Sequence, residues 1–480
     1  MSQVRPLLVE NAPPPAGTMA VTAPFDGRLL AEIEVGDERH VEAALACARA
    51  VFRNRVAWLP LHERVGILER TAVIIESRRD ALALEAALEG GKPLADSRVE
   101  VARAIDGIRL CIETIRTEQG HVVPMGGTAA GAARAAFTLR EPVGVVVAVS
   151  AFNHPLNLIV HQVAAAVAAG CPVIVKPAED TPLSCLRLVE ILREAGLPPA
   201  WSQVLIAANV ATAEQLVTDP RVAFFSFIGS ARVGWMLRSK LAPGTRCALE
   251  HGGAAPLILA EDADLELAVP AVAKGGFYHA GQVCVSVQRV YAHKSIARIF
   301  AVRLAGAANL LEVGDPADPA TEVGPLIRGA EVVRIADWVD EARAAGAEVL
   351  SGGASIGESC FACTVLFEPP EDVRVSREEI FGPVVCVYPY DELDGAIERA
   401  NRLPFAFQAA VFTRHLETAL RVFRRIDASA VMVNDHTAFR VDGMPFAGLR
   451  ESGLGVGGIP HTIADMQIEK MLVIKSEELG

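Results

Sequence analysis

The sequence predicts an α/β fold with a doubly wound parallel sheet. From "VGVVVAVS" at 143–150 onward, short apolar strands alternate with helices. A second alternation of the same kind begins near "APLILAEDADLE" at 255–266 and continues to about 440. The tail holds a separate strand-like segment, "QIEKMLVIKSEE" at 467–478, which could pair outside its own domain. Alternating strands and helices are typical of parallel sheets that carry helices on both faces.

The first 140 residues precede this alternation and are mainly helical. "PFDGRLLAEIEV" at 24–35 predicts a turn and a strand. Helical patterns follow at 37–57, at 61–89 as one helix, and at 95–120. The Gly/Ala-rich stretch "MGGTAAGAARAAFTLREPVG" at 125–144 then interrupts the helices and predicts the start of a hairpin.

Length and composition limit the number of domains and the classes of partner. At 480 residues it is too long for one ordinary core, so two or three domains are expected. Apolar residues make up 51% and charged residues 21%, which excludes disorder. The net charge of −13 argues against nucleic acid or an anionic membrane as a partner.

Compartment follows from the N-terminus and the cysteines. "MSQVRPLLVENAPPPAG" at 1–17 lacks the apolar core of a signal peptide. The most apolar stretch, at 158–175, carries His161, Gln162 and Pro172 and predicts a buried helix and strand rather than a membrane span. Nine scattered cysteines fit a reducing compartment. We therefore expect a cytoplasmic protein.

Three separated positions carry reactive side chains. Cys284 in "AGQVC" follows a glycine that lets the backbone approach a ligand, although a buried structural cysteine is the alternative. Glu250 ends an apolar strand before Gly-Gly and could activate water, or could be a solvated loop residue. Asn153 follows a buried strand and could donate to an oxyanion, or could form a turn before proline.

Other strand ends carry groups suited to a nucleotide. Lys176 and Glu179 in "VIVKPAED" could both bind a ribose. Ser230 in "SFIGSARVG" resembles part of a phosphate-binding turn, but the full glycine fingerprint is missing. Glu379 and Phe381 lie two apart, so an extended backbone would point both to one face.

In this order, these stretches resemble the aldehyde dehydrogenase superfamily over nearly the whole chain. The resemblance implies that Cys284 is the nucleophile, Glu250 the general base and Asn153 the oxyanion donor; the interval 284 − 250 = 34 matches the family. It implies a nicotinamide cofactor and an acyl-enzyme that water hydrolyses. The cofactor residues it implies are Lys176, Glu179, Ser230, Glu379, Phe381, Ala151, Phe152 and Gly229.

Two finer expectations follow from single carboxylates. Glu179 at the ribose should repel the 2′-phosphate of NADP, which favours NAD. Glu250 favours water over coenzyme A as acyl acceptor, because relatives that acylate coenzyme A tend to lack this base. The alternatives are a coenzyme A-acylating semialdehyde dehydrogenase and a catalytically silent binding protein on the same fold.

The substrate is expected to be a short aldehyde with a polar or anionic tail. Local motifs are similar to the subgroup that oxidises phosphonoacetaldehyde, and to relatives acting on lactaldehyde, sulfonated aldehydes or glyceraldehyde 3-phosphate. His154 and Arg440 match that subgroup's tail-binding residues, and Arg103 is a third candidate that could equally be a surface charge. Val283 stands where phosphate-handling relatives often carry arginine, which leaves less charged aldehydes open.

The resemblance implies three parts and several subunits. The expected ranges are 1–118 with 141–250 for cofactor binding, 251–445 for catalysis, and 119–140 with 460–480 for an oligomerisation extension. The last part would dock on a neighbouring subunit and give a homodimer or homotetramer. His251 replaces the family's usual leucine beside the base, which puts the pH profile in question. No metal site is expected, and the Cys360-x-x-Cys363 pair lacks the context of a redox motif.

Overall fold

Five parallel strands and one short antiparallel strand form the first sheet of the computed structural model, which describes residues 4–479. The strand order is β21-β9-β8-β5-β6-β7, so the order reverses beside β5. The carboxyl ends of β5 and β8 therefore flank a crevice of the kind that binds ligands in doubly wound sheets. The strands are β5 (Val145–Val149), β6 (Val173–Lys176), β7 (Ser202–Val204), β8 (Val222–Ile228), β9 (Arg246–Glu250) and β21 (Gly453–Leu454).

Helices cover both faces of this sheet. Val145 and Val147 of β5 pack on one face with α1 (Glu38–Arg53) and α8 (Val210–Thr218). Val146 and Ala148 point to the other face, which α2, α4 and α7 cover. Side chains alternate along a strand, and an uninterrupted apolar run therefore serves two cores. The covering helices are α2 (Leu61–Ser77), α3 (Arg79–Gly90), α4 (Leu94–Thr117), α7 (Leu183–Glu194) and α9 (Ala231–Arg238).

The prediction of one helix over 61–89 was wrong. α2 ends at Ser77 and α3 begins at Arg79, because Arg78 leaves helical geometry with φ −115° and ψ 13°. The Ser77 hydroxyl donates to the carbonyl of Ile74 at 2.7 Å, a local bond of the kind that helps a helix end. The hydrophobic pattern continues through this break because both helices pack on α4 and α7.

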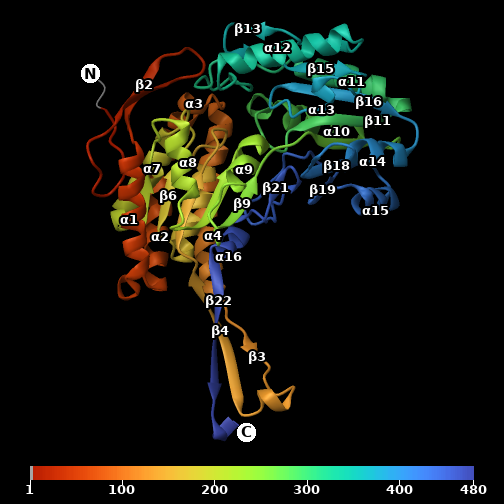
Figure 1. Ribbon diagram of the computed structural model, residues 1–480. Helices are drawn as coiled ribbons and strands as arrows, with labels where there is room; N and C mark the ends of the chain where they lie inside the picture. Colours follow the sequence, from red (N-terminus) through yellow and green to blue (C-terminus); the bar gives the residue numbers. More distant parts are fainter. Residues whose placement is uncertain (1–3, 480) are drawn as a thin grey trace.

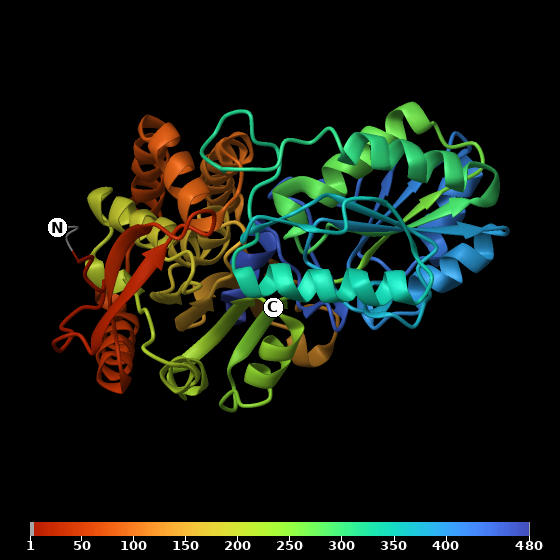
Figure 2. The same cartoon turned by 90° about the horizontal axis from the view of Figure 1, so that it is seen from above.

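A second, seven-stranded sheet lies in the other lobe, in the order β12-β15-β16-β11-β10-β18-β19, and all pairs except β12–β15 are parallel. Figure 2 shows the two lobes side by side, seen from above. The prediction of a second α/β unit is thus confirmed. Its strands are β10 (Ala255–Leu259), β11 (Val287–His293), β12 (Glu348–Ser351), β15 (Thr364–Phe367), β16 (Val384–Tyr390), β18 (Gln408–Phe412) and β19 (Ala430–Val433); its main helices are α10 (Leu265–Phe277), α11 (Lys294–Ala308), α12 (Gly329–Ala344), α14 (Leu393–Asn401) and α15 (Leu416–Arg425).

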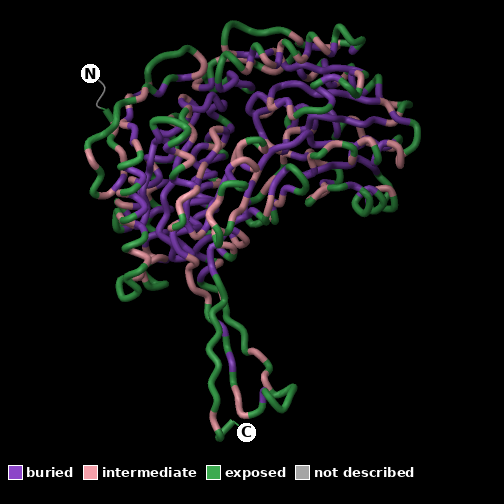
Figure 3. The backbone as a smooth tube through the Cα atoms, viewed as in Figure 1, coloured by how far each residue is buried: buried purple, intermediate pink, exposed green. Residues whose placement is uncertain are grey.

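The predicted hairpin and C-terminal strand form a three-stranded arm that projects from the first lobe (Figure 1). β4 (Arg134–Pro142) pairs antiparallel with β22 (Gln467–Lys475) along its whole length, and β3 (Val122–Val123) flanks β4. Figure 3 shows that most of this arm is exposed. In residues 4–479 no helix is both long and apolar enough to span a bilayer.

The chain passes directly from the first sheet to the second between β9 and β10. β9 ends at Glu250, and β10 begins at Ala255 in the other lobe. A late loop, residues 434–458, returns to the first sheet, where Gly453 of β21 pairs with Glu250. The end of β9 therefore lies where both lobes meet.

Candidate active site

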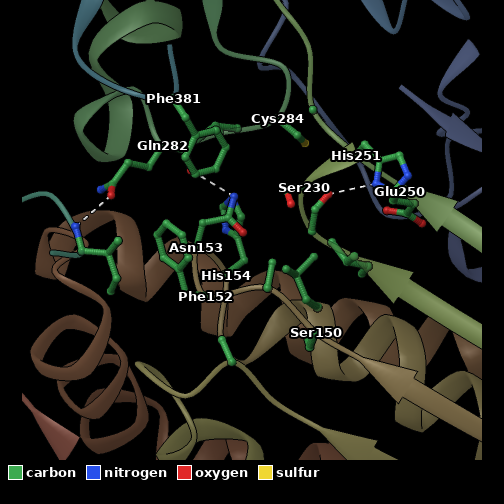
Figure 4. A pocket seen from close by; sticks show the side chains of 18 of the residues that line it. Ser150, Phe152, Asn153, His154, Ser230, Glu250, His251, Gln282, Cys284 and Phe381 are labelled. Atoms are coloured by element: carbon green, nitrogen blue, oxygen red, sulfur yellow. Dashed lines mark hydrogen bonds between the residues drawn. The ribbon is translucent and has the colours of Figure 1, made fainter. Parts of the chain in front are cut away.

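One pocket of about 460 Å³ lies between the lobes and receives every side chain that the sequence placed at a site. Figure 4 shows Cys284, Glu250 and Asn153 converging on it from different elements. The site residues that line it are Arg103, Ala151, Phe152, Asn153, His154, Lys176, Glu179, Gly229, Ser230, Glu250, Cys284, Glu379, Phe381 and Arg440.

Cys284 lies in a loop between α10 and β11 that a left-handed turn shapes. His279, Ala280 and Gly281 have φ values of 49°, 53° and 69°. A side chain on Gly281 could not fit, because its Cβ would lie 2.1 Å from the carbonyl oxygen of Gly382. Positive φ costs free energy at His279 and Ala280, which are not glycine, and such strain is found where the surroundings hold a functional loop in place.

Gln282 holds that loop and was missed by the sequence analysis. Its Nε2 donates to the carbonyls of His279 at 3.3 Å and Pro325 at 3.2 Å, and its Oε1 accepts from the N–H of Ile327 at 2.9 Å. The main-chain oxygen of Gln282 accepts from Nδ2 of Asn153 at 3.0 Å. The only sequence signal was its place two residues before Cys284.

The thiol of Cys284 sits among opposing charges. Burial raises the pKa of Cys284 to about 12; the Arg440 guanidinium acts against this, and the carboxylates of Glu250 and Glu379 act with it. Burial also raises the pKa of Glu250, again against Arg440. A carboxyl group with a raised pKa is a stronger base near neutral pH than a solvated one, and general-base work requires this property.

The late glycine-rich loop seats the Glu250 carboxylate. A Cβ on Gly457 would lie 2.2 Å from Oε1 of Glu250, so only glycine permits this approach. The neighbouring His251 also lines the pocket: its Nδ1 bonds the carbonyl oxygen of Gly229 at 2.9 Å, and its ring packs edge-on against Phe227 and Trp235. His251 therefore braces the start of α9.

The residues at the ends of β6 and β8 fit a dinucleotide. Nζ of Lys176 contacts the carboxylate of Glu179 and donates to the carbonyl of Pro177 at 3.0 Å. Although burial opposes it, the Lys176 charge lowers the pKa of Glu179. Ser230 begins α9 without capping it through its hydroxyl, so that hydroxyl and the first-turn N–H groups are available to a phosphate.

Glu379 and Phe381 line the pocket, but not by the expected route. The segment is not an extended strand: Phe381 has φ 48°. Oε1 of Glu379 accepts from the N–H of Gly253 at 3.0 Å, and a Cβ on Gly252 would lie 1.6 Å from that oxygen. The rings of Phe381 and Phe152 meet edge-on at 5.8 Å.

The candidate tail-binding arginines differ in how they are paired. Arg103 donates to both carboxylate oxygens of Asp442, at 3.2 and 2.7 Å, so it is not an ordinary surface charge. Arg440 stacks on Phe446, with Cζ 3.6 Å from the ring centroid. Its Nε and Nη2 are buried and have no hydrogen-bond partner within residues 4–479.

Comparison with known proteins shows which family the chain belongs to. The sequence pattern of the aldehyde dehydrogenase family matches residues 12–472. A 3-sulfolactaldehyde dehydrogenase of Priestia megaterium is 38% identical over 459 residues, which are 96% of this chain and 95% of the relative.

Solved structures agree over almost the whole length. An NAD-dependent aldehyde dehydrogenase from Sinorhizobium meliloti superposes with a TM-score of 0.93 at 30% identity, covering 99% of this chain and 95% of that one. A glyceraldehyde-3-phosphate dehydrogenase from Methanocaldococcus jannaschii complexed with NADP gives 0.91 at 32% identity, covering 95% and 99%. The chain therefore belongs to the aldehyde dehydrogenase family, whose members oxidise aldehydes with a nicotinamide cofactor.

Proposed function

We propose that the protein uses NAD to oxidise a short aldehyde with an anionic tail to its carboxylic acid, with water as acyl acceptor. The negative charge of the tail is inferred from the surroundings of Arg440. A buried guanidinium with two unpaired nitrogens is costly unless an anion completes it, and Arg440 lines the same pocket as Cys284. The Asp442 carboxylate bonds Arg103, Asn157 and His161, and within residues 4–479 it makes no hydrogen bond to the buried Nε or Nη2 of Arg440.

Three residues in the pocket, Cys284, Asn153 and Glu250, support a covalent mechanism. Sγ of Cys284 attacks the carbonyl carbon, and its proton passes to a base in the pocket. The second N–H of the Asn153 amide and the Cys284 N–H stabilise the oxyanion, since one Asn153 donor already holds Gln282. Hydride loss from the tetrahedral carbon would leave a thioester on Cys284; a nicotinamide bound in this pocket would supply the acceptor for that hydride.

Hydrolysis completes the reaction. Glu250 takes a proton from water, the hydroxide adds to the thioester, and the thiolate of Cys284 leaves with the bonding electron pair. The raised pKa of Glu250 suits this proton transfer. A carboxylate at the position of Glu250 is also what favours water over coenzyme A.

The proposed preference for NAD rests on Glu179. Its side chain is about half exposed at the pocket rim, and Lys176 keeps it in the charged form. A second negative group at that rim, such as a 2′-phosphate, would be repelled. Lys176 and Glu179 would hold the adenosine ribose, Ser230 and Gly229 the pyrophosphate, and Glu379 with Phe381 the nicotinamide end.

The arm supports a proposed homo-oligomer. Leu139 of β4 and Met471, Leu472 and Ile474 of β22 are exposed large apolar side chains on the projecting sheet. Such side chains gather on protein surfaces mainly where another surface covers them. We infer a second copy of this chain as that surface; light scattering that returns only monomer would contradict this. The cytoplasmic location is likewise a proposal, supported by cysteines that are all unpaired.

A panel of aldehydes tests the proposed function. We expect kcat/KM to be highest for phosphonate, sulfonate or carboxylate tails, lower for lactaldehyde, and lowest for a quaternary ammonium tail. Coenzyme A should change no rate. Arg440→Met should lower kcat/KM for anionic aldehydes by about 10- to 100-fold, since a charged hydrogen bond is lost. Neutral aldehydes should lose less, because they lose only the effect of the Arg440 charge on the pKa values of Cys284 and Glu250, which all aldehydes share.

The matched control is Arg238→Met, which removes another arginine that stacks on an aromatic ring, 5.5 Å from the centroid of Trp235, outside the pocket lining. It should change neither class of substrate. If Arg440→Met left kcat/KM unchanged for every anionic aldehyde, the proposed tail chemistry would be wrong.

A further inference from the structure

A buried ion pair lies behind the pocket wall and takes no part in the proposed chemistry. Lys92, 1% exposed, follows the left-handed Gly91 at the end of α3. Its Nζ contacts the carboxylate of Glu100, 2% exposed, on α4. The same Nζ lies 2.9 Å from Nδ1 of His154, and His154 lines the pocket.

Glu100 organises the loop that carries His154 as well. Its Oε1 accepts from the N–H groups of Leu156 and Asn157, both at 2.9 Å, while its other oxygen accepts from Lys92. Three donors are the partners of a carboxylate rather than of a carboxylic acid. Burial lowers the pKa of Lys92, but the charge of Glu100 and its hydrogen bond act against this and favour an ammonium beside the carboxylate.

Hydrogen-bond chemistry then fixes the His154 ring. An ammonium has three donors and no lone pair, so Lys92 must donate and Nδ1 of His154 must accept. A neutral imidazole carries one N–H, which leaves it on Nε2. Burial, followed by the charge of Lys92, lowers the pKa of His154 well below its ordinary value, so the ring stays neutral. The titratable and charged groups that face this ring are Lys92, Arg103, Tyr278, His279 and Arg440.

We propose that Lys92, held by Glu100, is a positioning residue that fixes His154 as a neutral Nε2–H donor to the tail of the aldehyde. The identity of the tail rests on the proposed function, whereas the tautomer of His154 does not. A fixed donor favours tails that accept hydrogen bonds, such as sulfonate, phosphonate or carboxylate oxygens. It also makes the contribution of His154 independent of pH in the neutral range, unlike that of a histidine free to titrate.

The tautomer is tested directly by nitrogen NMR of protein labelled with ¹⁵N-histidine. The chain has eleven histidines, and the spectrum of His154→Gln identifies which signals belong to His154. We expect Nε2 to show the shift of a protonated nitrogen and Nδ1 that of an unprotonated one, unchanged from about pH 6 to 8. A protonated Nδ1, alone or with Nε2, would overturn the proposal without any enzyme assay.

Kinetics tests the consequence. The double variant Lys92→Met/Glu100→Gln removes the donor without leaving a lone buried charge, and the new amide oxygen can still accept from Leu156 and Asn157. If the Nε2–H form falls to between a half and a tenth of the population, KM for an anionic aldehyde should rise about two- to tenfold with kcat nearly unchanged. KM for a neutral aldehyde of equal size should stay constant.

Arg98→Met is the matched control. Arg98 lies on α4, as Glu100 does, and its ion pair with Asp80 of α3 is exposed. It should leave both KM values unchanged. An equal rise of KM for both aldehydes in the double variant would show a merely structural role and overturn the proposal. A wild-type enzyme indifferent to tail charge would instead refute the proposed substrate class, while the NMR result would still decide the tautomer.

Discussion

Nδ2 of Asn153 donates to the main-chain oxygen of Gln282 at 3.0 Å, and this bond ties the loop after β5 to the loop that carries Cys284. The two residues lie 129 positions apart and belong to different lobes. The distance between the proposed oxyanion donor and the nucleophile is thus set by a direct contact. A carboxamide has two N–H groups, so holding Gln282 leaves one for the substrate.

Asn153→Ala should therefore lower kcat by about 10²–10³, the usual cost of losing an oxyanion donor. The Kd of the cofactor should change little. Asn401→Ala is the matched control, because it removes an amide-to-carbonyl bond of 2.9 Å, to Arg425, outside the pocket lining. Thermal unfolding of both variants separates loss of chemistry from loss of structure. A kcat within threefold of wild type would remove Asn153 from the mechanism.

Glu250→Gln should separate the two halves of the reaction. The thioester still forms, but water is no longer deprotonated, so steady-state turnover should fall by about 10²–10⁴. Rapid mixing should then show a burst of about one reduced cofactor per subunit, followed by almost no turnover. Glu451→Gln, an exposed glutamate on the late loop, is the control. Loss of the burst together with turnover would assign Glu250 to deprotonation of the thiol instead.

Local patterns were enough to predict strands and their loop ends, because buried parallel strands leave uninterrupted apolar runs such as 145–149. They could not predict contacts that only the packed chain creates. Arg103 and Asp442 are 339 positions apart, and the ion pair of Lys92 with Glu100 is visible only once α3 and α4 are placed.

Backbone conformation was equally hidden. Alanine rarely adopts positive φ, and the sequence around Ala280 therefore did not predict the left-handed turn before Cys284. The resemblance named the reactive residues, and the structure gathers them in one pocket. The proposed roles of the pocket residues and the domain limits stay predictions.

Glu179→Ser should relax the choice of cofactor. Wild type is expected to favour NAD, and the variant should raise kcat/KM for NADP by about 5- to 30-fold, the range for one repulsion at a half-exposed rim. Asp180→Ser is the control, since Asp180 is an adjacent pocket carboxylate that Arg328 already pairs, with Nε at 2.9 Å. A wild-type enzyme that uses NADP as well as NAD would contradict the role given to Glu179.

Glu379 should make cofactor binding depend on pH near neutrality. Burial raises the pKa of Glu379 to about 7, with the N–H of Gly253 and the charge of Arg334 acting against it. A carboxylate accepts hydrogen bonds from sugar hydroxyls better than the protonated group does, so binding should favour the ionised form. The affinity for NAD should therefore rise as pH increases through about 7 and level off above it. Below about pH 7, Kd should change by at most about tenfold per pH unit. Fluorescence titration from about pH 5 to 9 measures this, Glu379→Gln should abolish the pH dependence, and the exposed neighbour Glu378→Gln should preserve it. A flat profile in the wild type would mean that Glu379 does not bind the cofactor through its carboxylate form.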